Sequence, residues 1–276
     1  MLIIQMLVSF VAGGVLISLI SLLAEKVNQQ IAGIILMFPT TMVLGFFFLG
    51  ITTSAGHVAD IVPATLIPLS IVVFFSVFYI QAASFYSRYI TSKRTQIVCT
   101  ALTAAGVWMM IVIPFAVYQF RSLSTGIVCY LLMTTIALLL LNRKKLNTYV
   151  PRPVYTRSQI LLRAIFTGSV VSLVVLLAKT LNPFWGGIFA MFPAATFATL
   201  ATLHFYYEPQ QLFYFIRRAP VGTLSLFAYA MAALQFFPMF GVIWGTIASY
   251  FFSLLVTFLL IGYQKWGGAI KLRKSQ

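Results

Sequence analysis

The chain has 276 residues, of which 61% are hydrophobic and 8% are charged, and its mean hydropathy is +1.01. A water-soluble core of this size could not hide so many apolar side chains, so a soluble globular protein is excluded. The formal net charge is +15, with 18 Lys and Arg against three acidic residues. In a membrane protein this excess reports which side the basic loops occupy, so we expect no nucleic-acid partner.

Charge-poor apolar stretches predict an all-α integral membrane protein with about nine transmembrane helices. A hydrocarbon core about 30 Å thick needs roughly 20 apolar residues per helix. The division between the last two stretches rests on Pro238 and Gly241 alone, so an eight-helix count stays open. The predicted helices are 2–24, 31–51, 61–85, 97–118, 125–141, 159–181, 185–206, 219–238 and 240–262.

The distribution of Lys and Arg predicts the orientation of the chain. With nine helices, all of these residues except Arg121 and Lys179 lie on one side, which includes the C-terminal tail. Because cytoplasmic loops are enriched in Lys and Arg, we expect the N-terminus outside and the C-terminus in the cytoplasm. The expected location is the bilayer of the bacterial inner (plasma) membrane, with the 208–218 stretch along its cytoplasmic surface.

An internal repeat relates the two halves of the chain. The pattern Asn-x4-Gly-x3-Met-Phe-Pro occurs at 28–39 and at 182–193, and residues 14–50 align with 168–204 without a gap. Such self-similarity indicates a duplication. Five predicted helices separate the starts of the copies, an odd number, so the copies cross the membrane in opposite directions. The result is inverted repeats in a 4+1+4 arrangement: repeat 1 (1–118), a linker helix with a basic loop (119–158), and repeat 2 with a basic tail (159–276).

The repeated segments also resemble the signature of a known family. Residues 22–40 read LLAEKVNQQIAGIILMFPT, and residues 176–194 read LLAKTLNPFWGGIFAMFPA. Both are similar to the signature of the GlpM/YdgC family, four-helix bacterial inner-membrane proteins of roughly half this length. The chain resembles a fused tandem of that unit. The resemblance implies relatives that insert in both orientations and pair antiparallel, and it brings no catalytic residue with it.

The Phe-Pro pair of each repeat predicts a disturbed helix near the middle of the bilayer. Pro39 and Pro193 are each the ninth residue of a predicted helix, about 12 to 14 Å deep at a rise of 1.5 Å per residue. Proline leaves the carbonyl four residues earlier without its helical partner, so that group needs a neighbour, a hydroxyl or water. Paired broken helices of inverted repeats point to a transport site, and close packing of kinked helices is the alternative. The predicted solute path comprises Ile35, Phe38, Pro39, Thr40, Thr41, Phe189, Phe192, Pro193, Thr196 and Thr199.

Four polar residues lie at the ends of the two repeated hairpins. Asn28 and Asn182 precede helices, so we expect them to cap exposed N–H groups, with direct contact to a solute as the alternative. Glu25 and Lys179 occupy equivalent positions with opposite charge. Ordinary solvation at a helix end explains both.

The scarcity of acidic residues limits the function classes. Enzymes within membranes need carboxylate pairs, His clusters or metal ligands, so we expect neither an enzyme nor a cofactor or metal site. A coupled cation transporter would keep an Asp or Glu at mid-membrane. The sequence favours a transporter or facilitator that moves a small neutral or anionic solute through a site between the repeats. An ion channel of dual-topology origin and a non-transporting accessory or scaffold protein are the alternatives, and homo-oligomer formation stays open.

Overall fold

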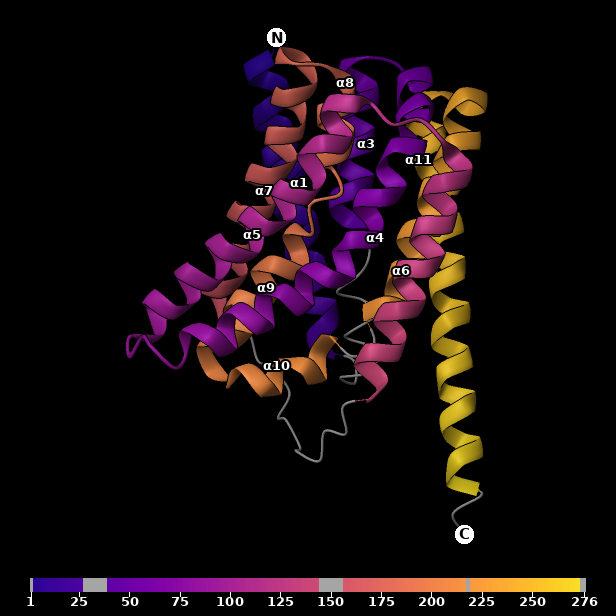
Figure 1. Cartoon of the computed structure of the whole chain (residues 1–276). Helices are drawn as coiled ribbons and strands as arrows, with labels where there is room; N and C mark the ends of the chain where they lie inside the picture. The colour runs from indigo at the N-terminus through magenta and orange to yellow at the C-terminus, as the bar shows by residue number, and fades with distance from the viewer. Residues whose placement is uncertain (1, 27–38, 144–155, 217–218, 274–276) are drawn as a thin grey trace.

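The computed structural model describes residues 2–26, 39–143, 156–216 and 219–273. Throughout these ranges the regular secondary structure is helical, and no strand occurs. Seven helical stretches are long and apolar enough to cross a membrane, and most helices share one general direction (Figure 1). The described part of the chain is therefore an all-helical bundle with the features of a multi-pass membrane protein.

Several helices begin at polar caps that lie outside the apolar stretches. Ser54 accepts a hydrogen bond from the N–H three residues later, and Thr156 forms a capping box with Gln159. The observed helices thus begin a few residues before the predicted 61–85 and 159–181. The helices are α1 (Leu2–Lys26), α3 (Thr40–Thr52), α4 (Ala55–Tyr86), α5 (Lys93–Tyr118), α6 (Leu123–Arg143), α7 (Arg157–Thr180), α8 (Pro183–Phe189), α9 (Ala194–Tyr206), α10 (Pro209–Ile216) and α11 (Ala219–Arg273).

Helix α11 folds back on itself at Gly241. This residue has φ 74° and ψ −174°, a conformation that glycine adopts without steric penalty. Ser253 Oγ donates a hydrogen bond of 2.8 Å to the Ser225 carbonyl, 28 residues away in sequence; in a straight helix the two would be about 42 Å apart. Helix α11 therefore consists of two antiparallel arms, 219–240 and 242–273 (Figure 1).

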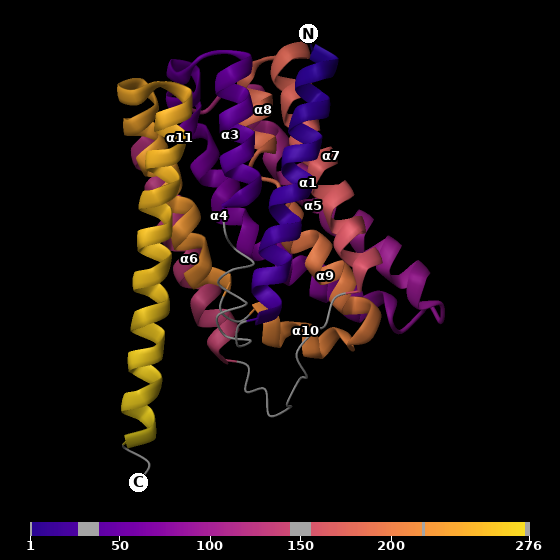
Figure 2. The ribbon, with the colours of Figure 1, turned by 180° about the vertical axis from the view of Figure 1, so that it is seen from behind.

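Helices α1 and α7 lie side by side and run in opposite directions (Figures 1 and 2). Glycines allow the close approach: a Cβ on Gly168 would lie 2.4 Å from the Phe10 carbonyl oxygen, and one on Gly13 would lie 3.0 Å from the Gly168 Cα. Small residues bring helix backbones into contact in this way within membranes. The α1–α7 crossing is thus fixed by residues without side chains.

Helix α4 forms the centre of the bundle, where it packs against α5, α6 and α11. An aromatic core joins it to the second half of the chain. Phe192 meets Phe75 of α4 edge-on at 5.9 Å and Trp108 of α5 at 5.1 Å, and Phe46 of α3 lies 6.0 Å from Tyr229 of α11. This core surrounds the short segment between α8 and α9.

Helix α10 crosses the general direction of the other helices, next to the end of α9 (Figure 1). This is the orientation that the sequence predicts for a helix lying along the membrane surface. The ion pair between Lys93 Nζ and Glu208 Oε1, at 3.5 Å, connects the start of α5 to the residue before α10. One end of the bundle thus carries a transverse helix and exposed charges.

Candidate functional site

The two Phe-Pro motifs each precede a helix of 13 residues, α3 and α9. Pro39 and Pro193 are the N-cap residues, with φ −73° and −76°. Their carbonyls accept the first helical hydrogen bonds, from Val43 N–H at 2.7 Å and from Phe197 N–H at 2.8 Å. Proline suits the start of a helix because its φ is already helical and its missing N–H would have no partner there.

The predicted continuous helix 185–206, kinked at Pro193, is wrong in one respect. Helix α8 ends at Phe189 and α9 begins at Ala194, so the segment between them is irregular. The Phe189 carbonyl finds its partner in the backbone, since it accepts a hydrogen bond of 2.9 Å from the Phe192 N–H. A tight turn of the backbone therefore satisfies the carbonyl for which the sequence suggests a neighbour, a hydroxyl or water.

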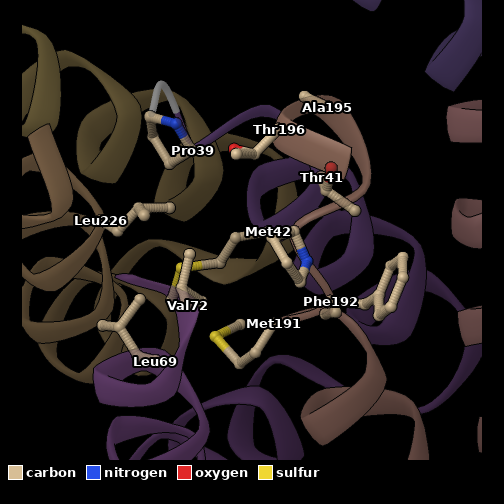
Figure 3. Close-up of a pocket in the computed structure, with 12 residues that line it drawn as sticks. Pro39, Thr41, Met42, Leu69, Val72, Met191, Phe192, Ala195, Thr196 and Leu226 are labelled. Atoms are coloured by element: carbon tan, nitrogen blue, oxygen red, sulfur yellow. The ribbon is translucent and has the colours of Figure 1, made fainter. Parts of the chain in front are cut away.

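The two helix starts meet at a small cavity of about 30 Å³ (Figure 3). This volume holds about one or two water molecules. Five residues of the predicted solute path line it together: Pro39, Thr41, Phe192, Pro193 and Thr196. The remaining wall comes from Met42 of α3, Leu69 and Val72 of α4, Leu226 of α11, and Ala190, Met191 and Ala195 around the α8–α9 break.

The cavity receives matching positions from both halves. The repeat offset of 154 relates Pro39 to Pro193 and Thr41 to Ala195. The same offset relates Met42 to Thr196 and Val72 to Leu226, and all eight residues line the cavity. In Figure 3 the labelled members of these pairs surround one space.

Helices α3 and α9 lead away from the cavity towards opposite ends of the bundle (Figures 1 and 2). Both N-termini therefore meet at the cavity. A helix N-terminus carries a partial positive charge, and the lining contains no acidic side chain. The electrostatic environment disfavours a cation and favours an anion or an electron-rich neutral group.

The other predicted path residues have different positions. Thr40 is buried, and its Oγ1 has no hydrogen-bond partner among the described residues. Thr199 accepts a hydrogen bond of 2.7 Å from Arg163 Nη2 and donates one to the Ala195 carbonyl. Phe189 packs edge-on against Trp108 at 5.9 Å. Ile35 and Phe38 lie outside the described residues.

The hairpin-end residues are described only for the second repeat. Asn182 is the N-cap of α8, and its side chain accepts a hydrogen bond from the Trp185 N–H at 3.3 Å, as the capping prediction requires. Lys179 lies exposed in the last turn of α7. Asn28 and the side chain of Glu25 lie outside the described part of the chain.

The sequence interpretation missed Arg163, whose side chain is buried in α7. A signal was present, because this residue is an arginine inside the apolar stretch 159–181. It also missed the α4 and α11 walls of the cavity, represented by Val72 and Leu226. These apolar residues differ in no sequence property from their many buried neighbours.

Groups suited to catalysis are sparse around the cavity. Its lining contains no Asp, Glu, His or Cys, and the described residues include no group of three such side chains that could hold a metal ion. Comparison of the chain with protein families, curated proteins and solved structures finds no match. What the cavity can do therefore follows from its geometry, which suits a small neutral or anionic group between two helix N-termini.

Proposed function

We propose that this protein is a membrane transporter or facilitator for a small neutral or anionic solute, which binds between two inverted repeats. The observation that carries the proposal is the cavity at which α3 and α9 both begin, lined by equivalent residues of the two halves. Discontinuous helices at a repeat interface are the usual way in which transporters expose backbone groups to a solute at mid-membrane.

The proposed architecture has nine spans in a 4+1+4 arrangement. Its support is that the repeat offset of 154 relates α3 (40–52) to α9 (194–206) residue for residue, and relates the first residue of α4, Ala55, to that of α10, Pro209. The second arm of α11 then corresponds to α5, while α6 has no counterpart. The opposite directions of α1 and α7 agree with an inversion (Figure 1).

We further propose that the N-terminus lies outside and the C-terminus in the cytoplasm of a bacterial inner membrane. Helix α1 begins at one end of the bundle and α11 finishes at the other (Figure 1), as an odd number of spans requires. Among the described residues, Arg121, between α5 and α6, and Lys179, in the last turn of α7, are the Lys and Arg at the end where α1 begins. The other end carries more of them, as expected of the cytoplasmic side. We also propose descent of both halves from a GlpM-like four-helix unit, on the strength of the shared motif.

Moving a solute through this site requires the two halves to shift. The cavity has room for about one or two water molecules. Its wall includes the large side chains of Met42, Met191 and Phe192 (Figure 3). Such a small, largely apolar space is not a continuous wet path of the kind that an open channel needs. A transporter that opens alternately to each side therefore fits better than a permanently open channel.

Flux measurements on the break residues test this proposal. The full chain in liposomes is exposed to gradients of single solutes, among them glycerol, urea and sodium formate, and swelling is followed by light scattering. Pro39→Ala and Pro193→Ala should each fold normally and impair flux, because alanine neither fixes φ at the helix start nor prevents the helix from extending beyond it, so the two starts that line the cavity would shift. Thr196→Val should weaken the apparent affinity about fivefold through loss of one hydroxyl.

The matched control is Pro68→Ala, which replaces a proline inside α4 that does not line the cavity, and it should leave flux unchanged. Normal flux in both break variants would contradict the proposal. Loss of expression or thermal stability alone would do the same. Either result would make the Phe-Pro motif a packing device and would favour the accessory or scaffold role.

A further inference from the structure

A second cavity, of about 730 Å³, lies between α5, α7 and α9. Its lining includes two arginines, Arg94 at the start of α5 and Arg163 within α7. The lining contains no acidic residue. The volume falls in the range of pockets that hold small molecules. The cavity, here called the arginine cleft, thus has one exposed positive charge, on Arg94, and a second, buried one in its wall, on Arg163.

Arg163 is the unusual residue of the arginine cleft. Its side chain is only 1% exposed although it lines the cavity, and its Nη2 donates a hydrogen bond of 2.7 Å to Thr199 Oγ1. Arg163 lies six residues beyond the first residue of α7, which is about 9 Å along the helix axis. The repeat offset places Ser9 at the equivalent position of the first half, so the shared architecture does not require this cation. An ionisable side chain at such a depth in a membrane is usually kept for function.

The arginine cleft is amphipathic along its length. At its polar end three helix termini meet: Arg94 is the second residue of α5, Thr156 caps α7, and Tyr206 ends α9. The Gln159 side chain hydrogen-bonds the Tyr206 hydroxyl at this end. Charged and hydroxyl groups therefore gather where these helices leave the apolar region.

The rest of the cleft wall is apolar. Phe166 and Phe197 stack at 4.7 Å with nearly parallel rings, and Leu162 lies on the rim with 65% of its surface exposed. In a membrane-spanning helix such an exposed leucine faces hydrocarbon. The cleft is therefore open sideways to the lipid, so an amphiphile could enter it without leaving the bilayer.

We propose that the arginine cleft binds one anionic phospholipid, with its phosphate on Arg94 and Arg163 and an acyl chain along Leu162 and Phe166. Arginine is suited to a phosphate because its guanidinium donates two parallel hydrogen bonds to the oxygens. Charge complementarity selects an anionic over a zwitterionic headgroup, and the apolar wall selects a lipid over a soluble anion. The site is separate from the central cavity and does not depend on transport.

Native mass spectrometry of the full chain in detergent tests this inference. The protein is titrated with dioleoyl phosphatidylglycerol or dioleoyl phosphatidylcholine, and the affinity for the first bound lipid is compared. The wild type should prefer phosphatidylglycerol about tenfold, and Arg163→Gln should abolish most of that preference through loss of a charged hydrogen bond. Arg94→Gln should reduce it about two- to fivefold, because this side chain is exposed.

The matched control is Arg157→Gln, which removes an exposed arginine from the first turn of α7 outside the cleft lining. Its lipid preference should stay within about twofold of the wild type. Arg94→Gln keeps the test valid if Arg163→Gln fails to fold. Equal binding of both lipids by the wild type, or an equal loss in the control, would overturn the inference. Displacement of phosphatidylglycerol by millimolar inorganic phosphate would also overturn it, because the ligand would then be a soluble anion.

Discussion

Gly168 determines how closely the two halves of the molecule approach each other. Its repeat counterpart is Gly14, so each half brings a glycine to the crossing of α1 and α7. A Cβ on Gly14 would lie 3.3 Å from the Ala164 carbonyl oxygen, and one on Gly168 would lie 2.4 Å from that of Phe10. The second distance leaves no room even for a methyl group, because the Phe10 carbonyl belongs to the backbone and cannot rotate away as a side chain could.

Gly168→Ala should therefore destabilise the folded protein by about 1 to 3 kcal/mol, the usual effect of overpacking a tight site. The control is Gly106→Ala in α5, where an added Cβ meets nothing within 4 Å and where alanine favours the helix. Thermal unfolding in detergent measures both. A melting temperature for Gly168→Ala at or above that of the control would show that α1 and α7 do not pack as described.

The fold of helix α11 into two antiparallel arms predicts a specific cross-link. Ser225 and Ser253 are joined by a hydrogen bond across the fold at Gly241. With the native Cys99 and Cys129 replaced by serine, the pair Ser225→Cys and Ser253→Cys, at two buried positions, should form a disulfide within one chain under mild oxidation. Peptide mapping by mass spectrometry detects the product.

The control pair is Ser225→Cys with Gly262→Cys. Position 262 lies nine residues beyond Ser253 on the same arm, about 13 Å further along the helix axis, so this pair should not form a disulfide. Cross-linking of neither pair would indicate that α11 is one continuous rod.

The helices themselves were predictable, while the break between α8 and α9 was not. The apolar run 97–118 predicts the end of α5 correctly. The helix begins earlier, at Lys93, because its first turn includes Lys93 and Arg94, which precede the apolar run. Residues 190–193 are also apolar, so hydropathy reads them as helix interior. They can leave the helix because they are buried and their turn carries its own hydrogen bonds.

Across the two halves, the repeat related some of the residues that meet at the cavity, but it did not predict what surrounds them. The offset of 154 related Pro39 to Pro193 from sequence alone, and the structure places both at one cavity. The contribution of Leu69 to that cavity and the burial of Arg163 depend on how helices pack against each other. Helix packing in membranes depends on surface shape rather than on hydrophobicity, so the position of these residues required the structure.

If the two halves cross the membrane in opposite directions, one equivalent pair of residues must lie on opposite sides of it. Ser54, before α4, and Glu208, before α10, are 154 residues apart, and both are exposed. Substitution of Glu208 removes its exposed ion pair with Lys93, which contributes about 1 kcal/mol or less.

In a chain without native cysteines, Ser54→Cys and Glu208→Cys are labelled separately with a membrane-impermeant maleimide on intact bacterial cells. We expect the label at position 54 in intact cells, and at position 208 only after the membrane is permeabilised. Labelling of both positions from the same side would contradict the inversion and, with it, the proposed site between inverted repeats.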